Sequence, residues 1–448
     1  MKSSDKKRAG EEIDLTNFVE QIDVRKGLFD PAGEWEISLV PFQNKKGLSW
    51  YYTVSPMDYI EISFSRISTE PLEVVMRGFV DSVNLKTSVD SEGRPSRSYV
   101  ITGRDFGKMM DITRIYWLKE ISPDLPLLAL PGWQRLKERY GWQMNGKPVE
   151  LIEDLLGIVQ SQIDLLKNNC KGIPQIKFLG SDGILGDINQ FSMTQEDGSI
   201  WEFMQYLNNS PWNELYIMDY DDAPYLVFRK TPWKNTRNQL IQGDDSTYKQ
   251  TMAKTLSLEK SDLLSVDISR SDAEVKNYFF TFPVAYLATG QTAFKTAVLD
   301  GVDSELELRT NPYFIHKWDR DAGLYRFGFR RFENSSEYLD LNDIGTSKAL
   351  CRTLNENMVE AFRYNSAYES GTMKLKGNHK IKPGIYVSLK NQAGLVAEYY
   401  VNEVNHSLSF TEGSESFFTT LNVTRGTGYL LTRDIDAYTV EKMPYERN

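Results

Sequence analysis

The sequence predicts an α+β fold that is mainly β, with two homologous small antiparallel β-barrels and one inserted mixed α/β domain built from two chain segments. Three observations predict this fold. β-rich segments near the N-terminus recur, in the same order, towards the C-terminus. Aromatic residues make up 12% of the chain, with 24 Tyr and 22 Phe, and such side chains favour half-buried strands. Helical patterns begin only after the first β-rich stretch.

The repeated segments alternate apolar and polar residues, which predicts strands with one buried and one exposed face. The corresponding segments, first copy before second, are 21–26 and 265–270, 35–41 and 278–283, 56–60 and 383–387, 79–84 and 400–405, and 99–104 and 421–426. In the first copy, residues 30–33 and 91–93 contain the Pro and Gly that tight turns require. We therefore expect two barrels of similar topology.

Helical segments lie between the repeated strands. Residues 149–167 place apolar side chains at helical spacing, and Ser199 with Glu202 predicts a capping box at the start of a second helix. Residues 350–362 repeat apolar side chains at four-residue steps, which predicts a third helix. The predicted organisation is a disordered tail (1–12), a first barrel (13–110), the first segment of the inserted domain (111–255), a second barrel (256–283 and 382–430), the second inserted segment (284–381) and a C-terminal extension (431–448).

Length and composition limit the function classes. A chain of 448 residues is long enough for two or three domains, each with its own core. A formal net charge of −10 argues against a nucleic-acid-binding surface, which requires clustered cations. Two cysteines imply no disulfide framework and favour a reducing compartment. The first twelve residues lack a signal-peptide pattern, and no window has the roughly 20 apolar residues that membrane insertion requires.

Three segments together resemble a known family. They are 78–110 with VDSV and TGRDFGKMM, 199–233 with SIWEFMQYLNNSPWNELY and FRKTPW, and 398–426 with YYVNEVNHSLSF and TTLNVTRG. In this order and spacing they are similar to the baseplate hub proteins of contractile phage tails and related injection systems, the hub and late-control-D type. None of the segments is a catalytic signature.

The resemblance implies a homotrimer at the centre of a virion tail baseplate, assembled in the cytoplasm of a bacterial host. Two tube-like barrels per chain would give a ring of six similar units, which adapts the hexameric tail tube to a trimeric central spike. Neighbouring baseplate proteins are further expected partners. DNA is expected only as transient cargo in a channel, for which we expect an acidic lining that repels phosphates. No cofactor is implied.

Five residues are candidates for structural or interface roles. Arg104 and Arg425 each lie beside a Gly at the end of the second repeated hairpin, as ordinary surface arginines or as equivalent anchors that bind carboxylates or carbonyls of a neighbouring subunit. Val83 and Val404 lie in the repeated segments 79–84 and 400–405 and mark the regions expected to share one topology. His406 follows Val404 at a strand end, where an interface or structural role is a better interpretation than catalysis.

No catalytic or metal site is predicted. The three histidines lie far apart and form no metal-ligand spacing. Paired acids such as Asp221 and Asp222 are better explained as solvated loops than as hydrolase acids, and the Gly-rich stretch 180–186 lacks the Lys of a phosphate loop. An alternative function stays open: aromatic strands also suit a receptor-binding or cell-wall-carbohydrate-binding tail protein. Such a protein has no need of duplicated barrels.

Overall fold

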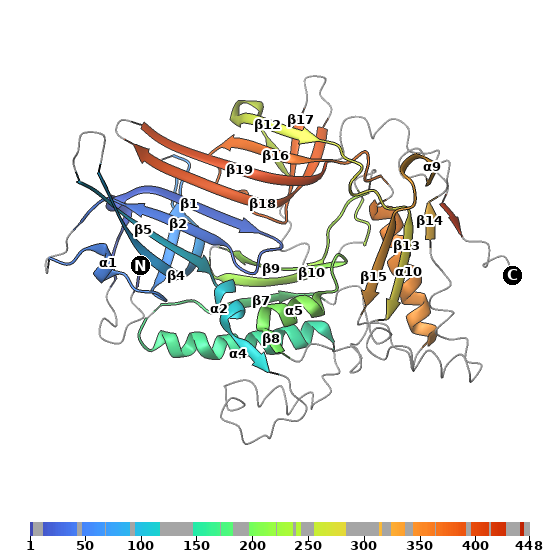
Figure 1. Cartoon of the computed structure of the whole chain (residues 1–448), viewed down its shortest axis with the longest axis horizontal. Coiled ribbons are helices and arrows are strands. Elements are labelled where there is room, and N and C mark those ends of the chain that lie inside the picture. Colours follow the sequence, from blue (N-terminus) through green and yellow to red (C-terminus); the bar gives the residue numbers. More distant parts are fainter. Residues whose placement is uncertain are drawn as a thin grey trace, which may run out of the picture.

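A computed structural model describes most of the chain. The described residues are 1–2, 12–42, 47–67, 69–89, 95–116, 147–170, 172–181, 197–220, 222–235, 239–242, 255–283, 313–315, 324–336, 344–362, 364–390, 396–411, 414–426 and 440–442. They form a mainly β structure around a large, 11-stranded sheet that is antiparallel except for one pair (Figure 1). Smaller sheets and the longer helices pack below and beside it (Figure 1).

The first half of the large sheet comes from the N-terminal part of the chain. Its strands are β1 (Val19–Gly27), β2 (Glu34–Leu39), β3 (Tyr59–Phe64), β4 (Glu73–Val89) and β5 (Pro95–Asp105). They pair in the order β1-β2-β5-β4-β3, and we call this set unit 1. Alternation buries Trp35, Ile37 and Leu39 of β2 in a core beside the short helix α1 (Trp50–Thr53).

The second half of the sheet, unit 2, repeats this order with strands from the C-terminal part of the chain. They are β12 (Leu263–Ser269), β16 (Glu369–Lys376), β17 (Tyr386–Lys390), β18 (Val396–Thr411) and β19 (Ser414–Gly426). They pair as β12-β16-β19-β18-β17, and β11 (Leu256–Leu258) adds a parallel pair to β17. Numbered within each unit, both orders read 1-2-5-4-3. Antiparallel pairing of β1 with β18 joins the units into one sheet.

Local geometry repeats as well. The fourth strand of each unit has a bulge at the same place, between Val80 and Ser82 in β4 and between Val401 and Glu403 in β18. Before the third strand, Met57 and Gly384 both adopt a left-handed backbone, with φ of 69° and 82°. Both donate a backbone hydrogen bond to the residue that begins the bulge, over 2.9 Å from Met57 to Val80 and 2.8 Å from Gly384 to Val401. A non-glycine residue rarely takes this conformation, so the agreement extends to individual dihedral angles.

The first inserted segment forms a layer of helices under a three-stranded sheet. It contains β6 (Arg114–Tyr116), α4 (Pro148–Lys167), β7 (Lys177–Gly180), β8 (Asp197–Ser199), α5 (Ile200–Asn208), β9 (Asn213–Asp219) and β10 (Pro224–Lys230), and α2 (Gly107–Ile112) leads into it. Alternate residues of β9 face opposite layers. Leu215 and Ile217 pack on the helices, whereas Tyr216 and Met218 pack against Tyr386 and Tyr400 of unit 2.

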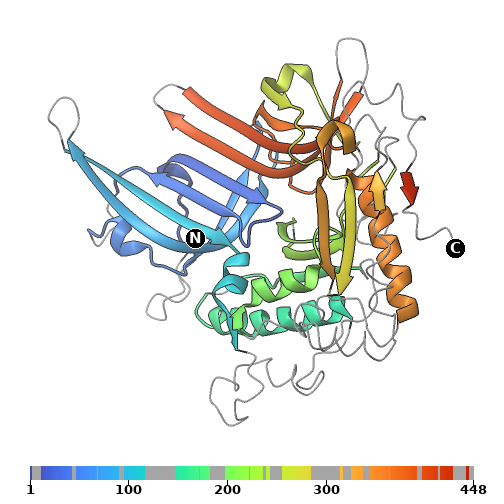
Figure 2. The same ribbon diagram turned by 45° about the vertical axis from the view of Figure 1, so that its right-hand side comes forward.

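The second inserted segment packs beside these layers (Figure 1, Figure 2). Its sheet, in the order β15-β13-β14-β20, contains β13 (Tyr278–Pro283), β14 (Tyr313–Ile315), β15 (Arg331–Ser336) and β20 (Val440–Lys442). The helices are α9 (Leu324–Phe327) and α10 (Ile344–Phe362). Trp212 and Trp233 of the first inserted segment join the core that α10 forms with β13.

Several predicted elements are confirmed. α4 begins one residue before the predicted helix and ends with it at Lys167, and α10 covers residues 350–362. The capping box is present: Ser199 Oγ accepts from the Glu202 amide at 3.1 Å, and the Glu202 carboxylate accepts from the Ser199 amide at 2.7 Å. No helix within the described ranges is long and apolar enough to cross a membrane.

The structure also corrects the predicted boundaries. The sequence predicts residues 278–283 as the second strand of the repeat, but β13 lies in the separate sheet with β14 and β15, and β16 takes that place in unit 2. Both units belong to one sheet, and no strand pair among the described residues closes either unit on itself, so the two predicted barrels are not confirmed.

The predicted chain ends are only partly described. In the tail expected to be disordered, Met1 and Lys2 hydrogen-bond to Ile13 and Tyr59. Residues 3–11 lie outside the described residues, as does the C-terminal extension except for β20.

Candidate assembly surface

One face of the large sheet is polar across both units. The register aligns these side chains, since Asp23 lies opposite both Glu36 and Ser407, and Glu36 lies opposite Thr102. The polar set includes Asp267, Lys374, Thr372, Thr420, Asn422, Asn405, Ser407, Asp23, Arg25, Glu34, Glu36, Thr102, Arg104, Ser82 and Asn84. The other face carries the apolar cores of both units. Period-two alternation therefore makes one continuous hydrophilic surface from two separate parts of the chain.

An open depression of about 640 Å³ lies on this polar face where the two units meet. Charged side chains of both signs line it, including Asp23, Arg25, Glu36, Asp81 and Arg104. Arg25 Nε binds the Glu403 carboxylate of unit 2 at 2.6 Å across the β1–β18 junction. The surface is thus hydrophilic with mixed charge.

Arg104 lies in this depression and is bound within its own chain. Its Nε contacts Asp81 at 2.9 Å, and its Nη1 contacts Asp111 at 2.8 Å. Lys108 Nζ also reaches Asp81, at 2.8 Å. Burial acts to raise the pKa of Asp81, but the hydrogen bonds from Arg104 and Lys108 outweigh it and lower the pKa. Arg104 therefore fixes the bulge in β4 and the start of the inserted segment.

Arg425 occupies a different environment at the end of β19. Its guanidinium lies 4.5 Å from the ring centres of both Trp233 and Tyr368, and its Nη2 donates to Ala361 O at 2.9 Å. The side chain is buried, and its backbone is left-handed, with φ of 53°. Arg425 thus connects unit 2 to α10 of the inserted segment.

The two arginines are not at equivalent positions. Phe79 pairs with Arg104 in unit 1, whereas Tyr400 pairs with Thr424 in unit 2, so the equivalent of Arg425 is Asp105. The predicted correspondence of residues 99–104 with 421–426 is therefore shifted by two residues. The sequence match of residues 56–60 with 383–387 is confirmed, because Tyr59 pairs with Phe79 and Tyr386 with Tyr400.

Val83 and Val404 are equivalent in register. Val83 pairs with Ile101, and Val404 pairs with Leu421, each just past the bulge of the fourth strand. They differ in the strand beside them. β1 pairs with β18 at Val404, which is buried, whereas no described strand pairs with the outer edge of β4 at Val83, which is half-buried. The same strand position is thus a junction in unit 2 and a sheet edge in unit 1.

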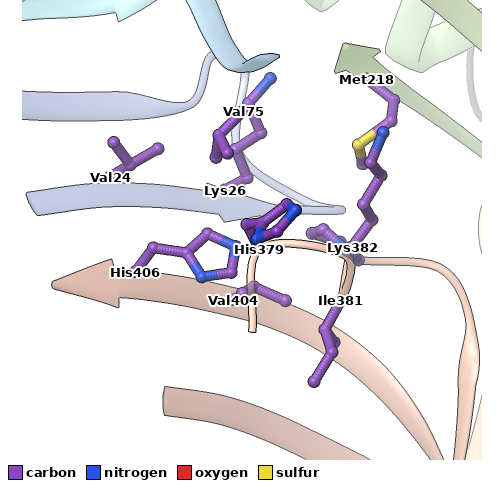
Figure 3. A pocket seen from close by; sticks show the side chains of 10 residues that line it. Val24, Lys26, Val75, Met218, His379, Ile381, Lys382, Val404 and His406 are labelled. Atoms are coloured by element: carbon purple, nitrogen blue, oxygen red, sulfur yellow. The ribbon is translucent and has the colours of Figure 1, made fainter. Parts of the chain in front are cut away.

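His406 is buried at the junction of the units, next to a small pocket (Figure 3). The rings of His406 and His379 lie close together in this view, with Val24 on the neighbouring strand β1 (Figure 3). His406 Nδ1 is 3.0 Å from Thr419 Oγ1. Burial, together with the nearby His379, lowers the pKa of His406 to about 3, so the ring is neutral at pH 7. The role that this geometry supports is packing between units.

Two buried charge clusters, which the sequence did not reveal, attach the three-stranded sheet to the units. In the first, Lys26 Nζ of β1 contacts Asp219 at 2.5 Å and Asp105 at 3.3 Å. In the second, Arg229 of β10 contacts Glu214 at 2.6 Å and donates to Gly384 O at 2.7 Å. The only signal in the sequence is charged residues inside apolar strands, which shows burial but not the partner.

Within the described parts of the chain, no group of three or more His, Cys, Asp or Glu side chains is placed to hold a metal ion. The Asp221–Asp222 pair is described only at Asp222, whose carboxylate binds Lys177 and Tyr225. Most of the Gly-rich stretch 180–186 lies outside the described residues.

Comparison with known proteins gives likeness at the level of fold. No family model and no curated protein sequence matches the chain. The crystal structure of the tail protein from Neisseria meningitidis MC58 has a TM-score of 0.50 at 13% identity, over 93% of this chain and 94% of that one. The prophage MuSo2 43 kDa tail protein from Shewanella oneidensis has a TM-score of 0.46 at 12% identity, over 93% and 95%. Prophage tail protein gp18 from Listeria monocytogenes EGD-e has a TM-score of 0.43 at 10% identity, over 95% of this chain and 94% of that one. The resemblance to tail proteins that the sequence predicts is confirmed for the fold, which this chain shares along nearly its whole length with a tail protein.

Proposed function

We propose that this chain is a structural hub protein of a contractile tail baseplate. Its two five-stranded units correspond to the two tube-like barrels expected for this family, and three chains place six of them in a ring. The ring docks on the hexameric tail tube and receives a trimeric central spike on the other side. Neighbouring baseplate proteins surround it, in a virion tail assembled in the bacterial cytoplasm.

One observation carries the proposal: the two units agree in strand order, in the position of the bulge and in the left-handed residue before the third strand. Independent units that merely shared a sheet would have no reason to agree at Met57 and Gly384. A repeated unit supplies six similar surfaces from three chains, and a threefold object can then meet a sixfold one without unmatched surface. The shared fold with a tail protein supplies the context.

The polar face suits the wall of a channel. Its side chains are hydroxyls, amides and charges of both signs, several of them neutralised by ion pairs such as Arg25–Glu403 and Arg104–Asp81. A wall without a basic surface gives passing DNA few cations to bind. Acidic side chains such as Asp23, Glu34 and Glu36 lie on this face, and an acidic lining of the channel stays a prediction.

Native mass measurement tests the proposal. We expect a species of three times 51.5 kDa, which electron microscopy images as a ring with a central opening. Mixed with its hexameric tube protein, the trimer is expected to cosediment with tube ends. A chain that remains monomeric up to high concentration and ignores the tube contradicts the hub and favours the carbohydrate-binding alternative, which a glycan-binding assay then checks.

A further inference from the structure

Two strand edges, one in each unit, lack a partner among the described strands and matter for assembly. β12 pairs with β16 on one side only. β4 runs well past its partner β3: the β3–β4 pairing stops at Phe79, whereas β5 follows β4 to Val89. From Ser82 onwards, β4 therefore has one open edge. Open edges are sites where another chain can add a strand.

The chain contains a template for covering such an edge. In the β1–β18 junction, the first strand of unit 1 pairs with the part of the fourth strand of unit 2 that lies beyond the bulge. The open edges are the two counterparts of this junction: the first strand of unit 2, β12, and the fourth strand of unit 1, β4. If the rotation that carries unit 1 onto unit 2 is applied once more, unit 2 of the first chain meets unit 1 of a second copy. The first strand of unit 2, β12, then lies beside the fourth strand of unit 1, β4, of that copy.

The register of the template predicts the register of this second junction. Inside the chain, Asp23 lies opposite Ser407, and Val24 lies opposite His406. Asp23 corresponds to Asp267, since the pairing of β1 with β2 and β5 matches that of β12 with β16 and β19. Ser407 corresponds to Lys86 by the matched bulges. The predicted pairs are Val266 with Thr87, Asp267 with Lys86, Ile268 with Leu85, and Ser269 with Asn84.

These pairs are complementary, although the register was obtained without regard to side chains. Asp267 meets Lys86, and opposite charges placed directly across antiparallel strands stabilise the pair. On the core side, Ile268 meets Leu85. Val266 and Leu85 are 44% and 43% exposed, whereas Val24 in the covered template strand is 1% exposed. Covering both edges would bury these apolar side chains in the same manner.

We propose that β12 of one chain pairs antiparallel with β4 of a second copy of this chain, with Asp267 opposite Lys86. The proposal rests on the hub trimer and specifies its contact. The surfaces on the two partners differ, so the contact is head-to-tail, and it forms a closed ring when the rotation returns after three chains. The six junctions of the ring then alternate between β1–β18 within a chain and β12–β4 between chains.

Charge reversal tests the register. Lys86→Asp places like charges at all three contacts, which at about 0.5 to 1 kcal/mol each corresponds to a roughly 10- to 100-fold larger trimer dissociation constant. The protein concentration at which half of the chains are assembled varies as the square root of this dissociation constant, so we expect that concentration to rise about 3- to 10-fold. Asp267→Lys is expected to act likewise, and the double variant Lys86→Asp/Asp267→Lys to recover most of the loss. Lys376→Asp, an exposed charge on the interior strand β16, is the matched control and leaves assembly unchanged.

Cysteine pairs test the direction of the contact. With Ser269→Cys and Asn84→Cys in every chain, a thiol cross-linker too short to span the roughly 13 Å of four strand residues is expected to yield covalent trimers. Ser265→Cys with Asn84→Cys is out of register by four residues and is expected to give none. The unmodified chain controls for reaction at its own Cys170 and Cys351.

The possible outcomes distinguish a failure of the β12–β4 contact from a failure of the hub proposal. A trimeric protein that tolerates both charge reversals and gives no in-register cross-link overturns the β12–β4 pairing and leaves the hub proposal in place. Cross-linking that stops at dimers overturns a closed three-chain ring. A chain that is monomeric even with tube protein overturns both proposals.

Discussion

The Arg229 cluster gives the sharpest test of how the inserted segment is held to unit 2. Arg229 is 0% exposed, and it bonds Glu214 through Nε at 2.8 Å and Nη2 at 2.6 Å, Gly384 O at 2.7 Å and the Tyr400 hydroxyl at 3.3 Å. The Tyr400 hydroxyl donates to Glu214 over 2.7 Å. The cluster therefore joins β9 and β10 to β18 and to the turn before β17. Removal of one charge leaves the other buried without compensation.

We expect Arg229→Met to lower the free energy of unfolding by about 3 to 5 kcal/mol, since breaking a buried ion pair leaves an uncompensated charge. The double variant Arg229→Met/Glu214→Gln removes both charges and keeps an acceptor for Tyr400. Its expected loss is smaller, about 1 to 3 kcal/mol, from the Gly384 carbonyl and the amide left without full pairing. A less harmful double variant identifies charge compensation, rather than packing, as the main contribution.

Urea unfolding followed by circular dichroism measures these differences. Variants are compared when their free energies of unfolding fall with urea concentration at the same slope. Arg25→Met is the control, because Arg25 binds Glu403 with its side chain 50% exposed, and such a pair contributes at most about 1 kcal/mol. A loss below about 1 kcal/mol in Arg229→Met, or a double variant less stable than the single one, would refute the reasoning.

Three further predictions concern other positions. Because the pKa of His406 is lowered to about 3, the unfolded chain binds the extra proton between about pH 6.5 and 3. The stability from the neutral ring is therefore complete above pH 6.5 and falls as the pH drops through this window, and His406→Asn should weaken that loss in pH-dependent thermal melts. Ser199→Ala removes the capping box of α5 and should cost about 1 kcal/mol in urea unfolding. Gly384→Ala places a Cβ 2.9 Å from the Arg229 guanidinium at a φ of 82° and should destabilise by about 1 to 3 kcal/mol.

Each of these has its own control or contrary outcome. Equal pH dependence of His406→Asn and the parent chain would assign the acid loss to other groups. If Ser199→Ala leaves the free energy of unfolding in urea unchanged within about 0.3 kcal/mol, α5 is held by its packed face alone. Gly157→Ala is the counterpart of Gly384→Ala: it lies inside α4 with open space at its Cβ, so we expect stabilisation by about 0.5 to 1 kcal/mol.

Local signals in the sequence predicted single elements well. The capping residues Ser199 and Glu202 act within one helical turn, and the apolar spacing of α4 and α10 is a property of one segment. The pairing of strands depends on distant parts of the chain. β13 reads Tyr-Phe-Phe-Thr-Phe-Pro and is far more apolar than β16, which reads Glu-Ser-Gly-Thr-Met-Lys-Leu-Lys, so the apolar content selected the wrong strand for unit 2.

The displaced correspondence of residues 99–104 with residues 421–426 has a similar cause. A slip of two residues keeps every side chain on its own face, so apolar alternation does not detect it, whereas a slip of one residue would reverse the faces. Matching at Tyr59 and Tyr386 succeeded because Pro56 and Pro383 mark the turn before each strand. Open edges such as β12 were not predicted either, since an unpaired edge is a property of the completed sheet.

The β1–β18 pairing changes how formation of the proposed ring depends on protein concentration. Six separate units would have to meet through five association steps, and the equilibrium concentration of the ring would vary with the sixth power of the concentration of free units. In the proposed ring, folding of each chain already makes one junction, so three chains need only two association steps, and the dependence falls to the third power of the chain concentration. Covalent linkage of the two units thus lowers the concentration threshold for assembly and excludes rings with an odd number of units.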